Sequence, residues 1–175
     1  GRLPEIRGGR QVIECIKQGH RGGYKVRGVI TGDETEVLNL KDLARSYELE
    51  KFIDFVGIVP QDQVRKLYKQ MDIGFSVVEN IKGTAGQKIR QYLMNGLVLV
   101  YENDELMDSY DEEFIIKLQE NDEFYKNLFE LFNKGNFNKN EIHNWAKTNV
   151  SYERFNLERI NHFLRLIGRT EDIQL

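Results

Sequence analysis

Three arginines near the start of the sequence have the chemistry and spacing to hold a phosphate group. Arg2, Arg7 and Arg10 lie in the segment GRLPEIRGGR, which precedes a stretch with helical character. An arginine side chain presents N–H donors in a planar fork that matches phosphate oxygens, and the adjacent Gly8 and Gly9 let the backbone approach a ligand closely. The segment therefore predicts a phosphate-binding loop, with solvated surface arginines as the alternative.

A second candidate loop contains small residues directly before another helical stretch. Gly83, Thr84 and Gly86 would leave backbone N–H groups at the helix start accessible to an anion, which the helix dipole also favours. Lys88 would add positive charge in the first helical turn, where a cation is otherwise unfavourable. The loop matches neither GxxxxGK[ST] nor GxGxxG, so it is not a Walker or Rossmann fingerprint.

The remaining polar residues show no pattern of metal ligands or nucleophiles. The three histidines are scattered, and the acidic residues between 102 and 113 have no fixed ligand spacing, so we interpret them as solvated surface. Cys15 stands among apolar residues of a helical stretch and is expected in the core; as the single cysteine it allows no intrachain disulfide. Gly32 and Gly57 stand in turns at the ends of apolar runs. They would either form the floor of a nucleotide pocket or only allow the chain to turn. We expect no metal and no other cofactor.

Short apolar runs alternate with helical stretches of about ten residues, without tight hairpin turns between them. This order is typical of parallel β–α units, because parallel neighbours need crossover connections. Val64, Leu67, Tyr68 and Met71 recur at helical spacing and predict an apolar stripe that covers one sheet face. The expected strands are 25–30, 52–59, 72–78 and 97–101, with a fifth near 114–118; the expected helices are 11–18, 38–47, 61–71 and 87–95, with others near 124–132 and 152–166.

The predicted fold is a Rossmann-like, doubly wound parallel α/β sheet with helices on both faces. No internal repeat or low-complexity linker divides residues 1–175, so we expect a single domain. Asp62 is the expected N-cap of the third helix, and Asn95-Gly96 is the expected end of the fourth. Ligands of such sheets bind beyond the carboxyl ends of the strands, so the candidate loops and the turns that follow the strands are the expected binding positions.

Charge and hydropathy restrict the class of partner. A net charge of −3 disfavours a nucleic-acid-binding surface, which usually carries a clustered basic excess. The sequence has no apolar run of about 18 residues and no basic-then-apolar leader, which argues against spanning and secretory interpretations. We expect a cytoplasmic protein, with membrane contact limited to peripheral association in the full-length protein.

Several segments, in order, resemble the C-terminal, donor-binding domain of the group 1 (family 4) glycosyltransferases, which is one half of a GT-B fold. They are GRL followed by Arg7-Gly8, GVITGD, FIDFVGIVPQDQVRKLYKQMDIGFS and KIRQYLMNGLVLV. The resemblance implies that Arg2 and Arg7 clamp the diphosphate of a nucleotide-sugar donor, with the amides of residues 83–86 and Lys88 nearby. It also implies that Gly57 and the residues after it border the base.

One departure from the family pattern affects the catalytic residues. The family usually carries two glutamates separated by seven residues, one near the donor sugar and one on the ribose. Here Gln91 stands at the ribose position, and the family spacing leads back to Gly83; Glu79 would substitute if the loop carries a four-residue insertion. Because an amide can still bond ribose hydroxyls, donor binding should survive this change more easily than catalysis.

The resemblance implies transfer of a sugar from a nucleoside-diphosphate sugar to a glycan or lipid-linked acceptor, with retention favoured. The family pattern also places an apolar strand directly before GRL, so we expect a longer natural protein that supplies this strand and an N-terminal acceptor domain. Two alternatives stay open. One is a non-catalytic nucleotide-sugar-binding module or assembly subunit; the other is a response-regulator-like signalling domain, which would need an aspartate where the sequence has Phe55-Val56-Gly57.

Overall fold

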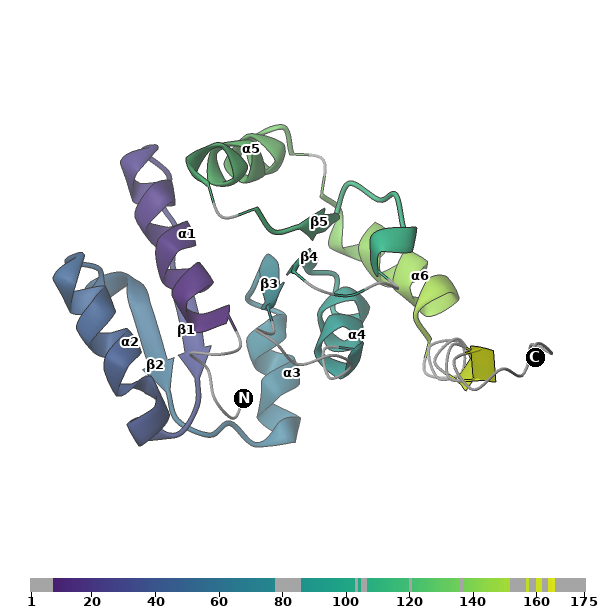
Figure 1. Ribbon diagram of the computed structural model, residues 1–175, viewed down its shortest axis with the longest axis horizontal. Helices are drawn as coiled ribbons and strands as arrows, with labels where there is room; N and C mark the ends of the chain where they lie inside the picture. Colours follow the sequence, from purple (N-terminus) through teal and green to yellow (C-terminus); the bar gives the residue numbers. More distant parts are fainter. Residues whose placement is uncertain are drawn as a thin grey trace.

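The computed structural model describes residues 8–77, 86–102, 104, 107–119, 121–135 and 137–151, together with 157, 160, 161, 164 and 165. Helices and short strands alternate from α1 to β4 (Figure 1). The helices are α1 (Arg10–Arg21), α2 (Glu34–Ser46), α3 (Gln61–Tyr68), α4 (Gly86–Met94), α5 (Asp122–Asn133) and α6 (Lys139–Asn149). The strands are β1 (Gly28–Thr31), β2 (Ile53–Val56), β3 (Ile73–Ser76), β4 (Val98–Tyr101) and β5 (Ile115–Lys117).

Every strand pair in the described part of the chain is parallel, as the alternating pattern predicted. The strands form two sheets, ordered β1-β2 and β3-β4-β5. Gly28 lies opposite Ile53 in the first sheet, and Ile73 lies opposite Val98 in the second. The prediction of a parallel α/β fold is confirmed, but β1 and β3 are not paired with each other, so the expected single sheet is divided in two.

Helices cover both faces of the β3-β4-β5 sheet. A Cβ atom on Gly74 would collide with the ring of Tyr92 in α4, whereas the next residue, Phe75, packs with Cys15 of α1 and Phe129 of α5. Because successive residues of a strand point to opposite faces, α4 lies on one face while α1 and α5 lie on the other. α6 packs on α4, and α2 packs beside α1 over the β1-β2 sheet (Figure 1).

Two of the expected helix boundaries can be compared with the observed caps. Asp62 is not an N-cap: Pro60 occupies that position in α3, and no side chain caps the helix. Pro fits this position because its fixed φ suits a helix start. The predicted end of α4 is confirmed, since the helix stops at Met94 and Gly96 has a φ of 75°, which glycine adopts without strain.

The C-terminal third contains one helix that the sequence pattern did not reveal. α6 begins after Asn138, whose side chain accepts a hydrogen bond of 2.9 Å from the N–H of Asn140. Only Ile142 and Ala146 of this polar helix are buried, so its apolar periodicity is weak. The predictions for β5 and α5 are confirmed, whereas most of the predicted helix at 152–166 lies outside the described residues.

Candidate functional site

A cavity of about 910 Å³ separates the two sheets. Residues 25–33, which contain β1, line one side, and residues 71–75, which contain most of β3, line the other. α1 and α5 contribute apolar side chains from one face, and α3 and α4 contribute side chains from the opposite face. We call this space the inter-sheet cavity. Its position puts the carboxyl ends of β1 and β3 at a shared edge, where open parallel sheets bind their ligands.

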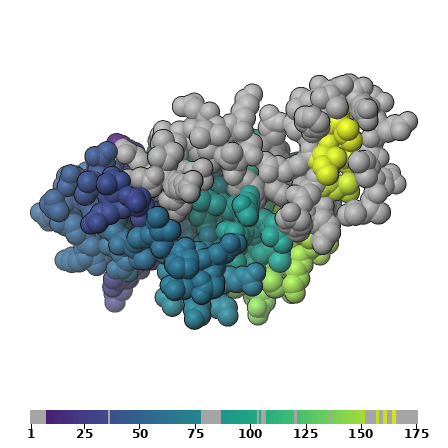
Figure 2. Space-filling model, turned by 90° about the horizontal axis from the view of Figure 1, so that it is seen from below, coloured from purple at the N-terminus to yellow at the C-terminus, as the bar shows by residue number. Residues whose placement is uncertain are grey.

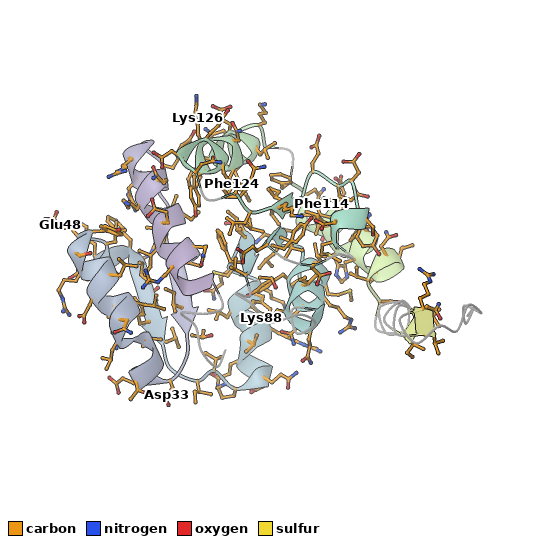
Figure 3. All side chains as sticks on the ribbon, viewed as in Figure 1. Asp33, Glu48, Lys88, Phe114, Phe124 and Lys126 are labelled. Carbon is orange, nitrogen blue, oxygen red and sulfur yellow. The ribbon has the colours of Figure 1, made fainter. Side chains whose placement is uncertain are left out.

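The polar lining of the inter-sheet cavity lies where the strands end and the following helices begin. Gly32 and Asp33 follow β1, Gln61 begins α3, and Lys88 lies in the first turn of α4. Figure 2, which views the molecule from below Figure 1, shows α2, α3, α4 and α6 following one another across this face. In Figure 3, Asp33 lies at the lower edge of the molecule and Lys88 lies nearer its centre.

Lys88 and Gln91 both line the inter-sheet cavity because a spacing of three residues brings them to one side of α4. The Gln91 Oε1 atom accepts a hydrogen bond of 3.4 Å from the Tyr68 hydroxyl. The Tyr68 ring lies edge-on to the Tyr92 ring, with centroids 5.3 Å apart. Burial raises the pKa of Tyr68, so its hydroxyl stays a neutral donor that orients the Gln91 amide.

Asp33 binds the start of α2. Its Oδ1 atom accepts hydrogen bonds from the Thr35 hydroxyl at 2.7 Å and the Thr35 N–H at 3.0 Å. These two bonds hold the pKa of Asp33 below its ordinary value, since both favour the ionised carboxylate. The carboxylate at the rim of the cavity is therefore charged and engaged in capping a helix.

The N-terminus of α1 reaches the inter-sheet cavity through two glycines. Gly8 and Gly9 both line it, and Gly8 has a φ of 94°, which favours glycine. A Cβ atom on Gly8 would lie 3.4 Å from the Val77 Cβ and 3.5 Å from the Phe75 Cβ. No side chain caps α1, and its first turn contains no acidic residue. This helix start therefore suits a bound anion more than a cation.

Of the residues that the family resemblance assigns to the donor site, the structure describes four. Lys88 and Gln91 come together at the cavity, and Gly86 is the first residue of α4. Gly57 does not line the cavity, but Ile58 and Val59 directly after it do. The other predicted site residues, which lie outside the described part of the chain, are Arg2, Arg7, Glu79, Gly83 and Thr84.

The sequence analysis did not identify the polar role of Tyr68, but it correctly predicted that Cys15 lies in the core. Tyr68 belongs to the apolar stripe of α3, and the spacing of that stripe does not reveal that the Tyr68 hydroxyl meets Gln91; the useful signal is a tyrosine, with a polar tip, within an otherwise aliphatic stripe. Cys15 is buried as predicted, and burial raises the pKa of its thiol to about 12. A neutral, enclosed thiol is a poor nucleophile.

Within the described residues, no three His, Cys, Asp or Glu side chains come close enough together to hold a metal ion. In the same part of the chain, no helix is both long and apolar enough to cross a membrane.

The fold and the cavity define a layered, parallel α/β domain with a ligand site at the carboxyl ends of its strands. The sequence profile of the family described as glycosyl transferases group 1 matches residues 1–110. The chain belongs to this family, and glycosyl transfer is therefore its general activity. The matched range includes α1 through β4, whereas β5, α5 and α6 lie beyond it. No curated protein and no solved structure matches the chain significantly.

Proposed function

We propose that this chain is the donor-binding domain of a glycosyltransferase that uses a nucleoside-diphosphate sugar. The observation that carries the proposal is the inter-sheet cavity, whose polar lining comes from the family-matched segment and includes Lys88 and Gln91 on one side of α4. A diphosphate at the mouth of this cavity would be close to Lys88 and to the glycine-containing start of α1. Both features favour negative charge.

The proposed chemistry is electrostatic stabilisation of the departing nucleoside diphosphate. As the bond to the sugar breaks, negative charge grows on the diphosphate, and cationic side chains and helix N-termini lower the energy of that charge. Arg2, Arg7 and Lys88 are the proposed donors, with the amides of Gly83, Thr84 and Gly86 beside them. No metal is required for this role, and Glu79 is the proposed carboxylate near the donor sugar.

Gln91 is the proposed contact to the nucleotide ribose. The hydrogen bond from Tyr68 occupies its Oε1 atom and leaves its NH₂ group as the donor available to a ribose hydroxyl. The base would lie toward Gly57, Ile58 and Val59. The acceptor, a glycan or a lipid-linked glycan, would bind an N-terminal domain, and transfer with retention of configuration is the proposed outcome.

The second candidate function is a non-catalytic nucleotide-sugar-binding module or assembly subunit. Gln91 favours it, because an amide at the ribose position preserves hydrogen bonding but supplies no carboxylate. Turnover by the complete protein with donor and acceptor distinguishes the two functions, since a module would bind donor and transfer nothing.

The first experiment is to titrate UDP, GDP, ADP and their sugar conjugates into the 175-residue chain by calorimetry and thermal shift. We expect one nucleotide to stabilise the fold, by about 2.7 kcal/mol at a concentration one hundred times its Kd. Lys88→Ala should weaken binding of that nucleotide about tenfold, because a charged hydrogen bond contributes roughly 1.5 kcal/mol. Arg7→Ala should weaken it at least as much.

The matched control is Lys126→Ala. Lys126 is an exposed lysine of α5 that does not line the inter-sheet cavity (Figure 3), so its removal lowers the net charge equally without touching the site. Circular dichroism establishes that each variant is folded. If no nucleotide stabilises the folded chain, or if Lys126→Ala weakens binding as much as Lys88→Ala, the donor-site proposal is wrong.

A further inference from the structure

Gln61 is the polar end of an otherwise largely apolar helix stripe. Gln61, Val64 and Tyr68 are separated by three and four residues, so their side chains leave α3 on one side. That side lines the inter-sheet cavity. Asp62 and Gln63 leave α3 in other directions, are exposed and do not line the cavity. Helical spacing therefore directs one glutamine of the first turn into the cavity and the other toward solvent.

The start of α3 holds Gln61 at the carboxyl end of β2. Pro60 occupies the N-cap position with a φ of −58°, which suits the entry into a helix. The Gln63 and Val64 N–H groups donate to the Pro60 carbonyl at 3.0 Å and 3.1 Å. In Figure 1 the loop between β2 and α3 lies at the same edge of the molecule as the loop between β1 and α2. Gln61 thus stands at the edge where parallel sheets bind their ligands.

The Gln61 carboxamide has no hydrogen-bonding partner in the described part of the chain. The Gln91 carboxamide differs, because it accepts a hydrogen bond from Tyr68. Gln70 also lines the cavity, but it precedes β3 and so belongs to the opposite edge of the sheets. An amide offers an acceptor oxygen next to an NH₂ donor, and it can rotate to present them in either order. Gln61 can therefore pair with a ligand edge that carries one donor beside one acceptor.

An apolar surface lies beside this amide. Ile58 is 77% exposed, and both Ile58 and Val59 line the inter-sheet cavity. A Cβ atom on the adjacent Gly57 would meet no atom within 4 Å, so the turn is open on that side. A flat ring with apolar faces and a polar edge could lie on Ile58 and Val59 and direct its edge at Gln61. These are the chemical properties of a nucleotide base, which proteins hold between apolar side chains and read by hydrogen bonds to its edge.

The proposed contacts to the rest of the nucleotide lie farther from the start of α3. Side chains of a helix lean toward its N-terminus, so the Tyr68 hydroxyl reaches back along α3 in the direction of Gln61. That hydroxyl donates to Gln91, the proposed ribose contact. Lys88, the proposed phosphate contact, precedes Gln91 by about one helical turn. A ribose at Gln91 could therefore direct its diphosphate toward Lys88 and its base toward Gln61.

We infer that Gln61 determines the base specificity of the chain. Its carboxamide pairs with one donor and one acceptor on the edge of the base, while Ile58 and Val59 support the face of the base. The inference rests on the proposed donor-binding function and adds to it the residue that reads the base.

The chemistry of the bases turns this inference into a specificity rule. Uracil, adenine and cytosine each present one donor beside one acceptor, which suits an amide. Guanine presents, in addition, two adjacent donors, its N1–H and its exocyclic NH₂ group. Two adjacent donors suit a carboxylate, which accepts hydrogen bonds at both of its oxygens. Exchange of the amide at position 61 for a carboxylate should therefore shift the base preference toward guanine.

The test measures the Kd values of UDP, ADP, GDP and inosine diphosphate by calorimetry. We expect Gln61→Glu to change the ratio of the UDP Kd to the GDP Kd at least tenfold in favour of GDP, because a carboxylate repels the acceptor oxygens of uracil. Inosine diphosphate lacks the exocyclic NH₂ group, so it should gain less than GDP. Gln61→Leu should weaken the preferred nucleotide about tenfold, which corresponds to the loss of two neutral hydrogen bonds.

The matched control is Gln63→Glu. It adds the same charge to the same turn of α3, but its side chain does not line the inter-sheet cavity. The ratios of Kd values should stay unchanged in this variant, since a general repulsion of the diphosphate affects every nucleotide equally. Circular dichroism establishes that each variant is folded.

Three outcomes would count against the inference. Equal shifts of the UDP to GDP ratio in Gln61→Glu and Gln63→Glu would overturn it, because charge alone would then explain the shift. Unchanged ratios in Gln61→Glu would also overturn it; if Lys88→Ala still weakens nucleotide binding, the donor-site proposal stands without it. If none of the four nucleotides binds the folded chain, both the donor-site proposal and the inference are wrong.

Discussion

The β3-β4-β5 half of the molecule is enclosed, whereas the β1-β2 half is covered on one face. All four residues of β4 are buried, because strands lie on both of its edges and helices lie on both of its faces. In β2 only Ile53 is buried, and Val56 is 40% exposed. The two halves have the same parallel β–α construction, so their difference comes from neighbours and not from local structure.

This comparison shows which side chains determine stability. A β-branched or aliphatic residue in a strand contributes through the area that its neighbours remove from water, and that area depends on sheet position. Truncation of the same residue type should therefore lower the free energy of unfolding strongly in β4 and only slightly in β2. The three predictions below test this difference, beginning with the largest effect.

Leu99→Ala should lower the free energy of unfolding by about 3 kcal/mol, since Leu99 is fully buried at the centre of β4 and its truncation leaves a cavity. The matched substitution Val56→Ala in β2 should cost less than about 1 kcal/mol, because much of that side chain is already in contact with water. Urea unfolding measures both values. Similar costs at the two positions would mean that the two halves are equally enclosed.

Glycines in β3 and β1 allow a second comparison. Gly74→Ala should cost about 2 to 3 kcal/mol, because the new methyl group would collide with the Tyr92 ring, which is held between α3 and β3. Gly28→Ala should cost about 1 kcal/mol, because its methyl group would meet the flexible end of the Ile16 side chain at 2.5 Å, and this end can move. Thermal unfolding of both variants at one pH ranks the two losses of stability. A larger loss for Gly28→Ala than for Gly74→Ala would contradict the prediction.

The ionisation of the Cys15 thiol tests the packing of α1, the helix that contacts both halves. Burial raises the pKa of its thiol from 9.0 to about 12, so the unfolded chain loses this proton first as the pH rises above 9.0. The stabilisation is complete below that pH and declines above it by about 1.4 kcal/mol per pH unit. Between pH 8 and pH 10 the unmodified chain should thus lose about 1.4 kcal/mol more stability than Cys15→Ala.

The matched pair of urea titrations at pH 8 and pH 10 isolates this contribution, because every other titrating group is common to both chains. Parallel losses in the two chains would show that the Cys15 thiol is solvated and that α1 is not docked on β3.

Most of the local structure could be predicted from the sequence, because it depends on short-range patterns. The apolar runs around Ile53, Ile73 and Val98 became parallel strands, and Asn95-Gly96 ended a helix through the backbone freedom of glycine. Lys88 and Gln91 were singled out from their positions in a helix and in a family pattern, and both line the inter-sheet cavity. α6 escaped prediction because only two of its residues are buried.

By itself, therefore, the sequence determined the element types, the parallel α/β class and the membership in the group 1 glycosyltransferases, since periodicity and motif order are properties of the chain. Only the tertiary structure decided that β1 and β3 stand apart across a cavity and that the Tyr68 hydroxyl meets Gln91. These features depend on contacts between segments far apart in sequence. No local pattern encodes them, because packing selects among arrangements with the same local propensities.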